Sequence, residues 1–335
     1  MPENALAPQD QMMQWITSKW ITHPLRVVSD LGIADLLKGG PESADALAER
    51  TGTHGPALYR VLRALCAVGI FIETENGVFD LTPLSRCLQS DALRPMVRMF
   101  LSLWHDKVWG GLGHTVRTGE PAFDHVFGKP AFEWLEEHPG ERTLLDQAQG
   151  VKAAGFAETI LAACDLKVLR SICDVGGGRG VFLMRLLAAY PHLEGIVADL
   201  PGAVGPAEKE IAAAGLQDRC KAVPSDFFKK PPPVCSAYFL VNVLHDWEDG
   251  ACRRILQNVA RSMKAESKLW VVEYLLEPAA GFPLAKLLDI EVLVMGGGRE
   301  RSRDEYAALL ASAGLNITSV IEAQQGPALI ECGKH

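Results

Sequence analysis

The stretch Asp174-Val175-Gly176-Gly177-Gly178-Arg179-Gly180 lies between a short apolar segment and an amphipathic one. Glycines at such a junction let the backbone approach a ligand, because no Cβ atom stands in the way. Open α/β sheets bind their ligands where a strand ends and the next helix begins. The stretch therefore predicts a ligand site at the carboxyl end of the first strand of an α/β sheet.

From about residue 165 onward, short apolar strands alternate with amphipathic helices. We expect strands over 169–175, 195–200, 220–227, 236–243, 269–276, 317–323 and 328–332, and helices over 181–190, 203–214, 250–263 and 303–313. This alternation is typical of a parallel, doubly wound sheet. The last two strands, joined by the turn Gln325-Gly326-Pro327, are expected to add an antiparallel edge.

The first hundred residues predict a different, mainly helical architecture. Helical spacing covers 12–37, where Pro24 should break or kink the helix, and then 43–50 and 56–68, which have the spacing of a helix-turn-helix. Strands over 70–72 and 78–79 flank Asn76-Gly77, a strong hairpin signal. Together these elements predict a winged helix.

The charge of the chain argues against nucleic acid as its partner. Residues 1–100 hold nine Lys and Arg against eleven Asp and Glu, and the whole chain has a net charge of −8. A DNA-binding module places cations against phosphates, whereas the tip of this wing carries Glu73 and Glu75. We therefore expect the winged helix to be a scaffold or dimerisation module.

The sequence also bears on location and on metals. No apolar run approaches the ~20 residues that span a bilayer, and residues 1–10 lack the layout of a signal peptide, so we expect a cytoplasmic protein without a membrane partner. The eight cysteines are scattered singly, which predicts neither a zinc site nor a disulfide framework.

Acidic residues near the glycine stretch indicate the kind of cofactor. Asp199 ends the next expected strand, where a carboxylate accepts hydrogen bonds from ribose hydroxyls. A dinucleotide needs G-x-G-x-x-G, but this chain has G-x-G-x-G after Asp174, which would repel a pyrophosphate. S-adenosylmethionine, a cation without phosphate, fits better than NAD. Asp226 and Phe227 could hold its adenine, although an ordinary surface loop also explains them.

Three residues at the same sheet edge suggest acid–base chemistry. His245 follows the fourth strand in Leu244-His245-Asp246-Trp247, Glu273 ends the fifth, and Glu300 precedes a helix. A histidine held by two acids is the arrangement expected for a general base with a fixed tautomer. Upstream, Met99, Trp104 and Trp109 lie in an aromatic-rich stretch that either packs helices or encloses a planar ligand.

Taken together, these features resemble the S-adenosylmethionine-dependent O-methyltransferases of the caffeic acid and hydroxyindole type. The resemblance covers almost the whole chain and rests on the winged helix, 174–180, Asp199-Leu200-Pro201, Ser225-Asp226-Phe227-Phe228, Leu244-His245-Asp246-Trp247, Glu273 and Gly297-Gly298-Arg299-Glu300-Arg301-Ser302. It implies a class I methyltransferase domain over 165–335, a winged-helix dimerisation domain over 1–100, and a helical linker over 101–164 that contributes to the substrate pocket. It also implies a homodimer, a small aromatic substrate and no metal.

The resemblance assigns roles to individual residues. His245 is expected to be the base, flanked by Glu273 and Glu300. The residues expected at the cofactor are Asp174, Gly176, Gly178, Gly180, Asp199, Leu200, Ser225, Asp226, Phe227, Asn242 and Trp247. Those expected at the acceptor are Met99, Trp104, Trp109, Gln149, Asp246 and Met295.

Three positions depart from the family pattern. Val241 stands where members commonly have Lys, Ser225 where they have Gly, and Gln149 where many have Met. The first two predict an altered adenine pocket, and Gln149 predicts a more polar acceptor. Alternatives that keep the fold are methylation of carbon or nitrogen, non-methyl chemistry, or a winged-helix regulator that senses S-adenosylmethionine.

Overall fold

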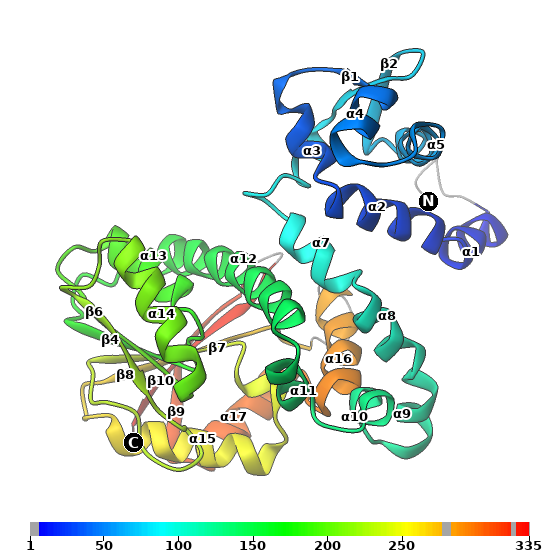
Figure 1. The fold of residues 1–335 in the computed structure, drawn as a ribbon. Coiled ribbons are helices and arrows are strands. Elements are labelled where there is room, and N and C mark those ends of the chain that lie inside the picture. The colour runs from blue at the N-terminus through cyan, green and yellow to red at the C-terminus, as the bar shows by residue number, and fades with distance from the viewer. Residues whose placement is uncertain (1–6, 277–282, 323–325, 335) are drawn as a thin grey trace. The chain divides into compact units, whose positions relative to one another are not determined.

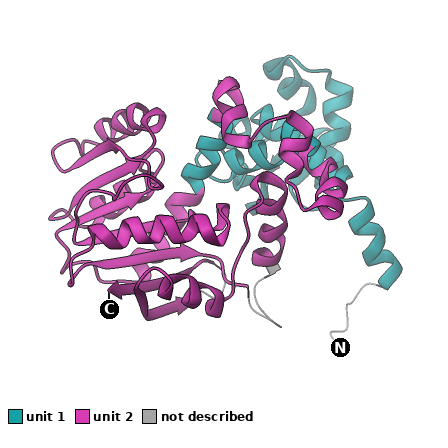
Figure 2. Ribbon diagram, turned by 90° about the horizontal axis from the view of Figure 1, so that it is seen from below, with its two compact units in different colours: residues 1–107, 143–151 teal, residues 108–142, 152–335 magenta. Residues whose placement is uncertain are grey.

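The computed structural model describes residues 7–276, 283–322 and 326–334. The chain forms two compact units, shown in Figure 2: unit 1 is residues 1–107 and 143–151, and unit 2 is residues 108–142 and 152–335. Two helices, α8 (Leu103–Gly110) and α12 (Pro139–Ala163), contain residues of both units. Among the described residues, no helix has the length and apolar character needed to span a bilayer.

Unit 1 contains the predicted helix-turn-helix and hairpin. Its helices are α1 (Pro8–Ile16), α2 (Lys19–Asp30), α3 (Ile33–Leu36), η1 (Leu37–Gly39), α4 (Ala44–Thr51), α5 (Gly55–Cys66), α6 (Pro83–Arg86) and α7 (Arg94–Phe100). The hairpin strands β2 (Phe71–Glu75) and β3 (Val78–Leu81) join a third strand, β1 (Glu42–Ser43), in the order β1-β3-β2. Gly77 has a φ of 77° in the hairpin turn, which a glycine adopts without strain.

The helical break in unit 1 lies earlier than the sequence suggested. Pro24 was expected to break or kink the first long helix, but it lies inside α2, and the interruption is at Thr17 and Ser18. The Thr17 hydroxyl donates to the carbonyl of Met13 at 2.7 Å, which satisfies the end of α1. Because α2 begins at Lys19, Pro24 lies in its second turn and removes one backbone donor there.

Unit 2 is built on a seven-stranded sheet, as predicted. Its strands are β4 (Ser171–Val175), β5 (Glu194–Asp199), β6 (Cys220–Pro224), β7 (Ala237–Val241), β8 (Lys268–Glu273), β9 (Leu315–Glu322) and β10 (Ala328–Lys334). Their order is β6-β5-β4-β7-β8-β10-β9. The first five strands are parallel and β10 is antiparallel to both neighbours, which confirms the antiparallel edge. Ala323, the end of the expected strand 317–323, and Gln325 of the expected turn lie outside the described residues.

Helices cover both faces of this sheet (Figure 1). One face packs against α12, α13 (Val181–Ala189) and α14 (Pro201–Ala213), and the other against α15 (Asp249–Ser262) and α17 (Arg303–Ala311). Alternate residues of one strand serve the two layers: Ile172 belongs to the first core and Cys173 to the second. The remaining helices of unit 2 are α9 (Leu112–Thr118), α10 (Ala122–Phe127), α11 (Ala131–Glu137) and α16 (Pro283–Gly296).

The strand order indicates at which point along the sheet a ligand would bind. The chain runs from β4 outward to β5 and β6, then returns to β7 on the other side of β4. Ligands of open α/β sheets bind at such a reversal, at the carboxyl ends of the strands. The glycine stretch follows β4 and His245 follows β7, so the two motifs flank the reversal.

Candidate active site

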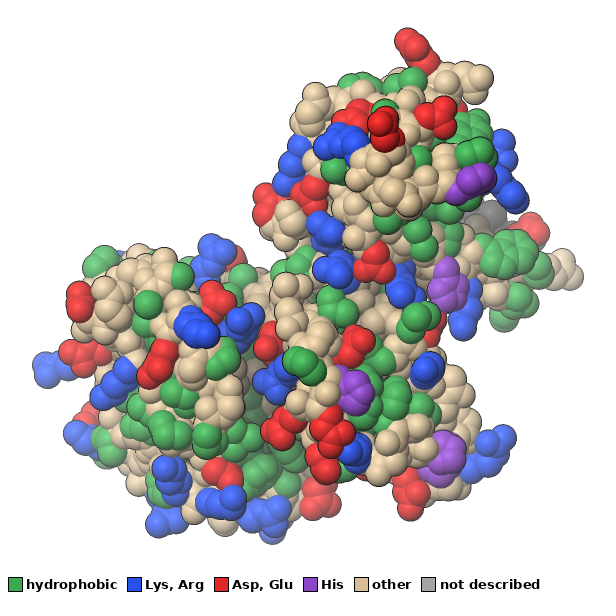
Figure 3. All heavy atoms as spheres, in the orientation of Figure 1, with side chains coloured by type: hydrophobic (Ala, Val, Ile, Leu, Met, Phe, Trp, Pro, Cys, Tyr) green, Lys and Arg blue, Asp and Glu red, His purple; other side chains and the backbone are tan. Residues whose placement is uncertain are grey.

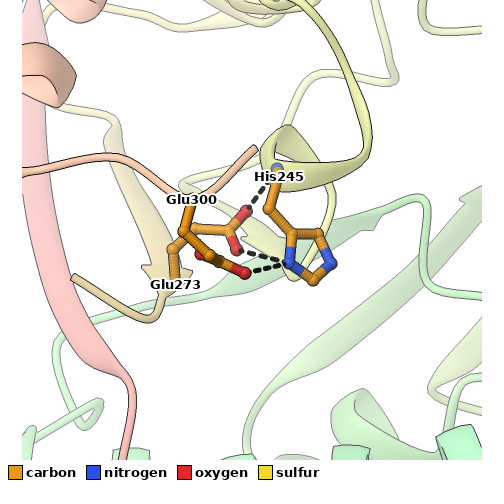
Figure 4. A group of neighbouring side chains, drawn as sticks. All are labelled: His245, Glu273 and Glu300. Carbon is orange, nitrogen blue, oxygen red and sulfur yellow. Dashed lines mark hydrogen bonds and ion pairs between the residues drawn. The ribbon is translucent and has the colours of Figure 1, made fainter. Parts of the chain in front are cut away.

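His245 is buried, and two acidic side chains from different parts of unit 2 approach its ring from the Nδ1 side (Figure 4). It belongs to η2 (Leu244–Asp246), a short turn that follows β7. Glu273 is the last residue of β8, and Glu300 lies between α16 and α17. His245 is 4% exposed, Glu273 0% and Glu300 1%. The fold thus brings together the three side chains that the sequence analysis had grouped at one edge of the sheet.

Glu300 is the acid that hydrogen bonds with the imidazole ring. Its Oε1 lies 2.7 Å from Nδ1 of His245. Because a carboxylate can only accept, Nδ1 carries the proton and Nε2 is the ring nitrogen that can take another. Glu300 therefore fixes the tautomer that a general base needs.

Glu273 holds the backbone of the turn. Its Oε1 accepts from three successive amides, those of Val243 at 3.1 Å, Leu244 at 2.8 Å and His245 at 3.4 Å. Its Oε2 lies 3.8 Å from Nδ1 of His245. Sequence analysis expected both acids to orient the ring, but the first amides of a helical turn lack internal partners, and Glu273 satisfies them. Glu273 therefore positions the turn, and Glu300 the ring.

Two polar neighbours lie beside the ring. Asp246 Oδ1 is 3.4 Å from Nε2. The side-chain nitrogen of Asn242, Nδ2, is nearly equidistant from both ring nitrogens, at 3.3 Å from Nδ1 and 3.2 Å from Nε2. Among the described residues, Asn242 is the non-glycine residue with positive φ, 50°, a backbone conformation that turns the chain sharply after β7. Asp246 belongs to η2, and Asn242 lies between β7 and η2.

The acidic surroundings favour the protonated ring. Burial alone would lower the pKa of His245, but attraction to Glu273 and Asp246 and the hydrogen bond with Glu300 outweigh it, and the pKa lies above its usual value. Burial raises the pKa of Glu273 to about 7. His245 and Glu273 lie 3.8 Å apart, so the protonation of each affects that of the other.

Backbone hydrogen bonds from residues 298–301 hold the turn that contains His245. The amide of Arg299 donates to the carbonyl of His245 at 2.9 Å, and the amide of Glu300 donates to Asp289 Oδ1 at 2.9 Å. A Cβ atom at Gly298 would overlap that His245 carbonyl, so only glycine allows this approach. The segment carries Glu300 to the ring as a result.

Arg301 is a positioning residue that sequence analysis missed. Its side chain is fully buried. The guanidinium donates to Asp249 Oδ1 at 2.9 Å and 2.8 Å, to the carbonyl of Leu244 at 3.1 Å, and to that of Trp247 at 2.7 Å. It thereby joins the residues on both sides of His245 to the start of α15. An arginine in a glycine-rich segment normally indicates a solvated loop, so the sequence carried no sign of this burial.

We expect Arg301→Met to lower kcat by roughly 10- to 100-fold, because a small displacement of the His245 turn misplaces the reacting groups. Arg299→Met is the matched control, since the Arg299 side chain is exposed and its amide contact with His245 remains. Thermal unfolding and kcat measured on both variants test this. An unchanged kcat in folded Arg301→Met would remove the positioning role.

At the carboxyl end of β4, the glycine stretch forms a tight, acidic cradle. Gly176, Gly178 and Gly180 have φ of 76°, 56° and 79°, and the Gly178 amide donates to Asp199 Oδ2 at 2.7 Å. Asp174 is buried, and its Oδ2 has no hydrogen-bond partner. Burial, and then the neighbouring Asp199, raise the pKa of Asp174 to about 7. A buried carboxyl without a partner fits a cationic ligand group.

The loop after β6 contributes polar and aromatic groups. Asp226 accepts from the Phe228 amide at 3.0 Å and lies 2.8 Å from Lys229 Nζ, a lysine that sequence analysis did not single out. The Phe227 ring lies beside Gly176, where a Cβ would be 3.4 Å from it, and 6.3 Å from the Trp247 ring. Of the other expected cofactor residues, Ser225 is buried and Leu200 is exposed.

The residues expected at the acceptor divide between the two units. Met99, Trp104 and Gln149 belong to unit 1, where the first two are buried and Gln149 is exposed; Trp109, Asp246 and Met295 belong to unit 2. Trp109 Nε1 donates to Glu291 Oε2 at 2.7 Å, and Asp246 lies against His245. Glu291 and Lys152 are polar residues near the site that sequence analysis missed, since both resemble solvated helix positions.

The chain is similar to known proteins over most of its length. Residues 109–316 match the family described as O-methyltransferase domain, and residues 13–91 match the O-methyltransferase dimerisation domain. The phenazine O-methyltransferase of Lysobacter antibioticus is 36% identical over 323 residues, which cover 96% of this chain and 94% of that protein.

Solved structures show the same similarity. The crystal structure of LaPhzM has a TM-score of 0.93 at 35% identity and covers 98% of this chain and 100% of its own. Human N-acetylserotonin methyltransferase, solved in complex with S-adenosylmethionine, has a TM-score of 0.90 at 26% identity and covers 100% of this chain and 99% of its own.

Proposed function

Because the chain belongs to the O-methyltransferases that carry a dimerisation domain, we propose that it methylates a phenolic hydroxyl of a small aromatic metabolite with His245 as general base. The observation that supports the base assignment is the 2.7 Å contact between Glu300 and Nδ1, which leaves Nε2 to take a proton. Its relatives include a mitomycin biosynthesis 6-O-methyltransferase and a 3-amino-4-hydroxybenzoate 4-O-methyltransferase.

S-adenosylmethionine is the cofactor, and the residues at the end of β4 fit it. The buried, partnerless Oδ2 of Asp174 suits its ammonium, and Asp199 suits its ribose hydroxyls. The glycines leave room for the backbone to approach. We propose that Asp174, Asp199, Asp226 and the glycine stretch hold the cofactor, with Leu200, Ser225, Phe227, Asn242 and Trp247 around them. When bound, it supplies an electrophilic methyl group on a sulfonium.

His245 assists by taking the acceptor's proton. A phenol with a pKa near ~10 and an ordinary imidazole near ~6.5 are poorly matched, so full deprotonation before attack is unfavourable. The acidic neighbours raise the pKa of His245 and thereby narrow this gap. The hydroxyl proton would move to Nε2 while the oxygen forms its bond to the methyl carbon. The bond between that carbon and the sulfonium sulfur would break at the same time, so that the sulfur leaves as a neutral thioether. The imidazolium that results is stabilised by Glu300 on Nδ1.

Metal independence is also a proposal. His245, Glu273 and Glu300 offer three ligand atoms within 4.8 Å of one another, a spacing that could accept a divalent cation. We assign these groups instead to proton transfer and to the backbone of the turn, because all three already hydrogen bond within the protein.

The exposed apolar surface of α1 and α2 supports a homodimer. Met12, Trp15 and Trp20 are 58%, 69% and 75% exposed. Figure 3 shows hydrophobic side chains gathered at the α1 end of the chain. A second copy would cover this surface, in keeping with the matched dimerisation domain.

We expect the protein to methylate one or more aromatic hydroxyl compounds in a panel offered with labelled S-adenosylmethionine, and to do so equally well after treatment with EDTA. Mass spectrometry of each product identifies the methylated atom. Labelled product from neutral phenols supports the proposal. Activity that disappears with EDTA and returns with Mg²⁺ would overturn the metal-independent mechanism.

A second candidate function keeps the fold but changes the acceptor or the chemistry. Relatives at 31% and 32% identity are an 8-amino-8-demethylriboflavin N,N-dimethyltransferase and an aclacinomycin 10-hydroxylase. Exclusive N-methylated or hydroxylated product in the same panel would favour it over O-methylation.

A further inference from the structure

Lys152 is a lysine of α12 whose ammonium interacts electrostatically with the acids of the candidate active site. Its Nζ is 5.8 Å from the centre of the Phe156 ring, and that ring is 6.1 Å from the ring of Tyr274, the residue after Glu273. The ammonium interacts electrostatically with four carboxyl groups, those of Asp246, Glu273, Glu300 and Glu291. A cation therefore lies within electrostatic range of the base, His245, and of the acids around it.

None of these four carboxyl groups pairs directly with the ammonium. Among the described residues, none of them lies within 4.0 Å of Lys152 Nζ. Three of them make hydrogen bonds elsewhere: Glu300 to the ring of His245, Glu273 to the backbone of the turn, and Glu291 to the indole of Trp109. The fourth, Asp246, lies against Nε2. The acids hold Lys152 by long-range attraction and leave its donors available.

A partly buried ammonium without a direct partner is costly, and burial lowers the pKa of Lys152. An anion that enters the site with the substrate would offset this cost. The acceptor hydroxyl must reach Nε2 of His245, so a second substituent on the same ring system extends into the space around the base. Lysine is a flexible point charge, which suits a substituent whose position varies among acceptors.

We propose that Lys152 binds a carboxylate on the aromatic acceptor, so that the preferred substrates are aromatic hydroxy acids. This inference rests on the proposed function, since it names the substrate class of the same site. The competing explanation is that Lys152 only balances the charge of the buried acids. In that case removal of Lys152 would change kcat/KM by the same factor for all acceptors, whether or not they carry a charge.

The test compares matched acceptors that differ in one group. Hydroxybenzoic and hydroxynaphthoic acids are paired with their carboxamides, which keep the ring and the hydroxyl but lack the negative charge. We expect the ratio of kcat/KM for acid over amide to exceed one in the unmodified enzyme. In Lys152→Met it should fall by roughly 10- to 100-fold, the range of a charge-assisted hydrogen bond, with the change mainly in KM of the acid.

Two further variants keep the test decisive. Lys152→Arg retains the charge and should recover most of the preference, whereas Lys167→Met removes an exposed lysine of the same unit and should leave the ratio unchanged. An equal loss for acid and amide in Lys152→Met, or no preference in the unmodified enzyme, would overturn the inference. A complete lack of methylated phenol would instead overturn the proposed function, so the two failures are distinguishable.

Discussion

His245→Ala is expected to lower kcat by about 10²- to 10⁴-fold while the affinity for S-adenosylmethionine is unchanged. The ring is buried, and its contacts are with Glu300, Asp246 and Asn242. Its removal deletes the proposed proton acceptor without touching the glycine stretch after β4. Single-turnover methylation and calorimetric titration of the cofactor measure the two quantities separately.

The pH dependence of the same reaction checks the assignment. Because the acids raise the pKa of His245, the neutral ring appears only above the usual histidine range, and activity should fall as the pH drops through that raised value. Asp246→Asn removes one of the groups that raises it, so the acidic limb of the profile should move to lower pH. The limb should disappear in His245→Ala.

Glu300→Gln supplies the matched control for the base. The amide keeps the size of the side chain but weakens the hydrogen bond at Nδ1, so kcat should fall less than in His245→Ala. If His245→Ala retained full turnover with an accepted substrate, the proton would have to leave by another route, and His245 would be a structural residue.

The strongly periodic parts of the fold could be predicted from the sequence. The strands of unit 2 and the Asn76-Gly77 hairpin follow from apolar runs and turn residues. The two-residue strand β1 has no period to detect, and it exists because Glu42 and Ser43 pair with β3. The break predicted at Pro24 was wrong because a proline shows only that one backbone N–H is missing. The packing around the helix decides where the helix ends.

Site residues could be predicted from the sequence where they lie at or just after the end of a strand, and less well elsewhere. His245 follows β7, and Glu273 is the last residue of β8. Because β7 and β8 are parallel neighbours, these two residues lie at the same edge of the sheet. Lys152 and Arg301 come from a helix and a loop whose patterns do not separate inward from outward positions. Lysine and arginine are mostly exposed in proteins, so only the packing reveals these two.

Asp174→Asn is expected to weaken S-adenosylmethionine binding by at least about 30-fold and to stabilise the protein without cofactor. The two effects share one cause. The carboxyl is buried without a partner for Oδ2, which favours its neutral form and raises its pKa to about 7. Above that pH the cofactor-free fold contains a buried charge, for which we propose the ammonium of the cofactor as partner, and asparagine removes that charge.

The sign of the pH effect follows from this raised pKa. A carboxyl whose pKa is about 7 when folded and ordinary when unfolded contributes its full stability at low pH, and loses it as the pH rises from ~4 to ~7. The stability of the cofactor-free protein should decline over that range by a few kcal/mol, and Asp174→Asn should flatten the decline. Cofactor affinity should rise over the same range, since binding favours the charged form. Chemical denaturation and cofactor titration at several pH values measure both, with the exposed Asp218→Asn as control. A variant that binds the cofactor normally, or that is less stable at pH 8, would show that Asp174 is a structural residue of β4 with no role at the ammonium.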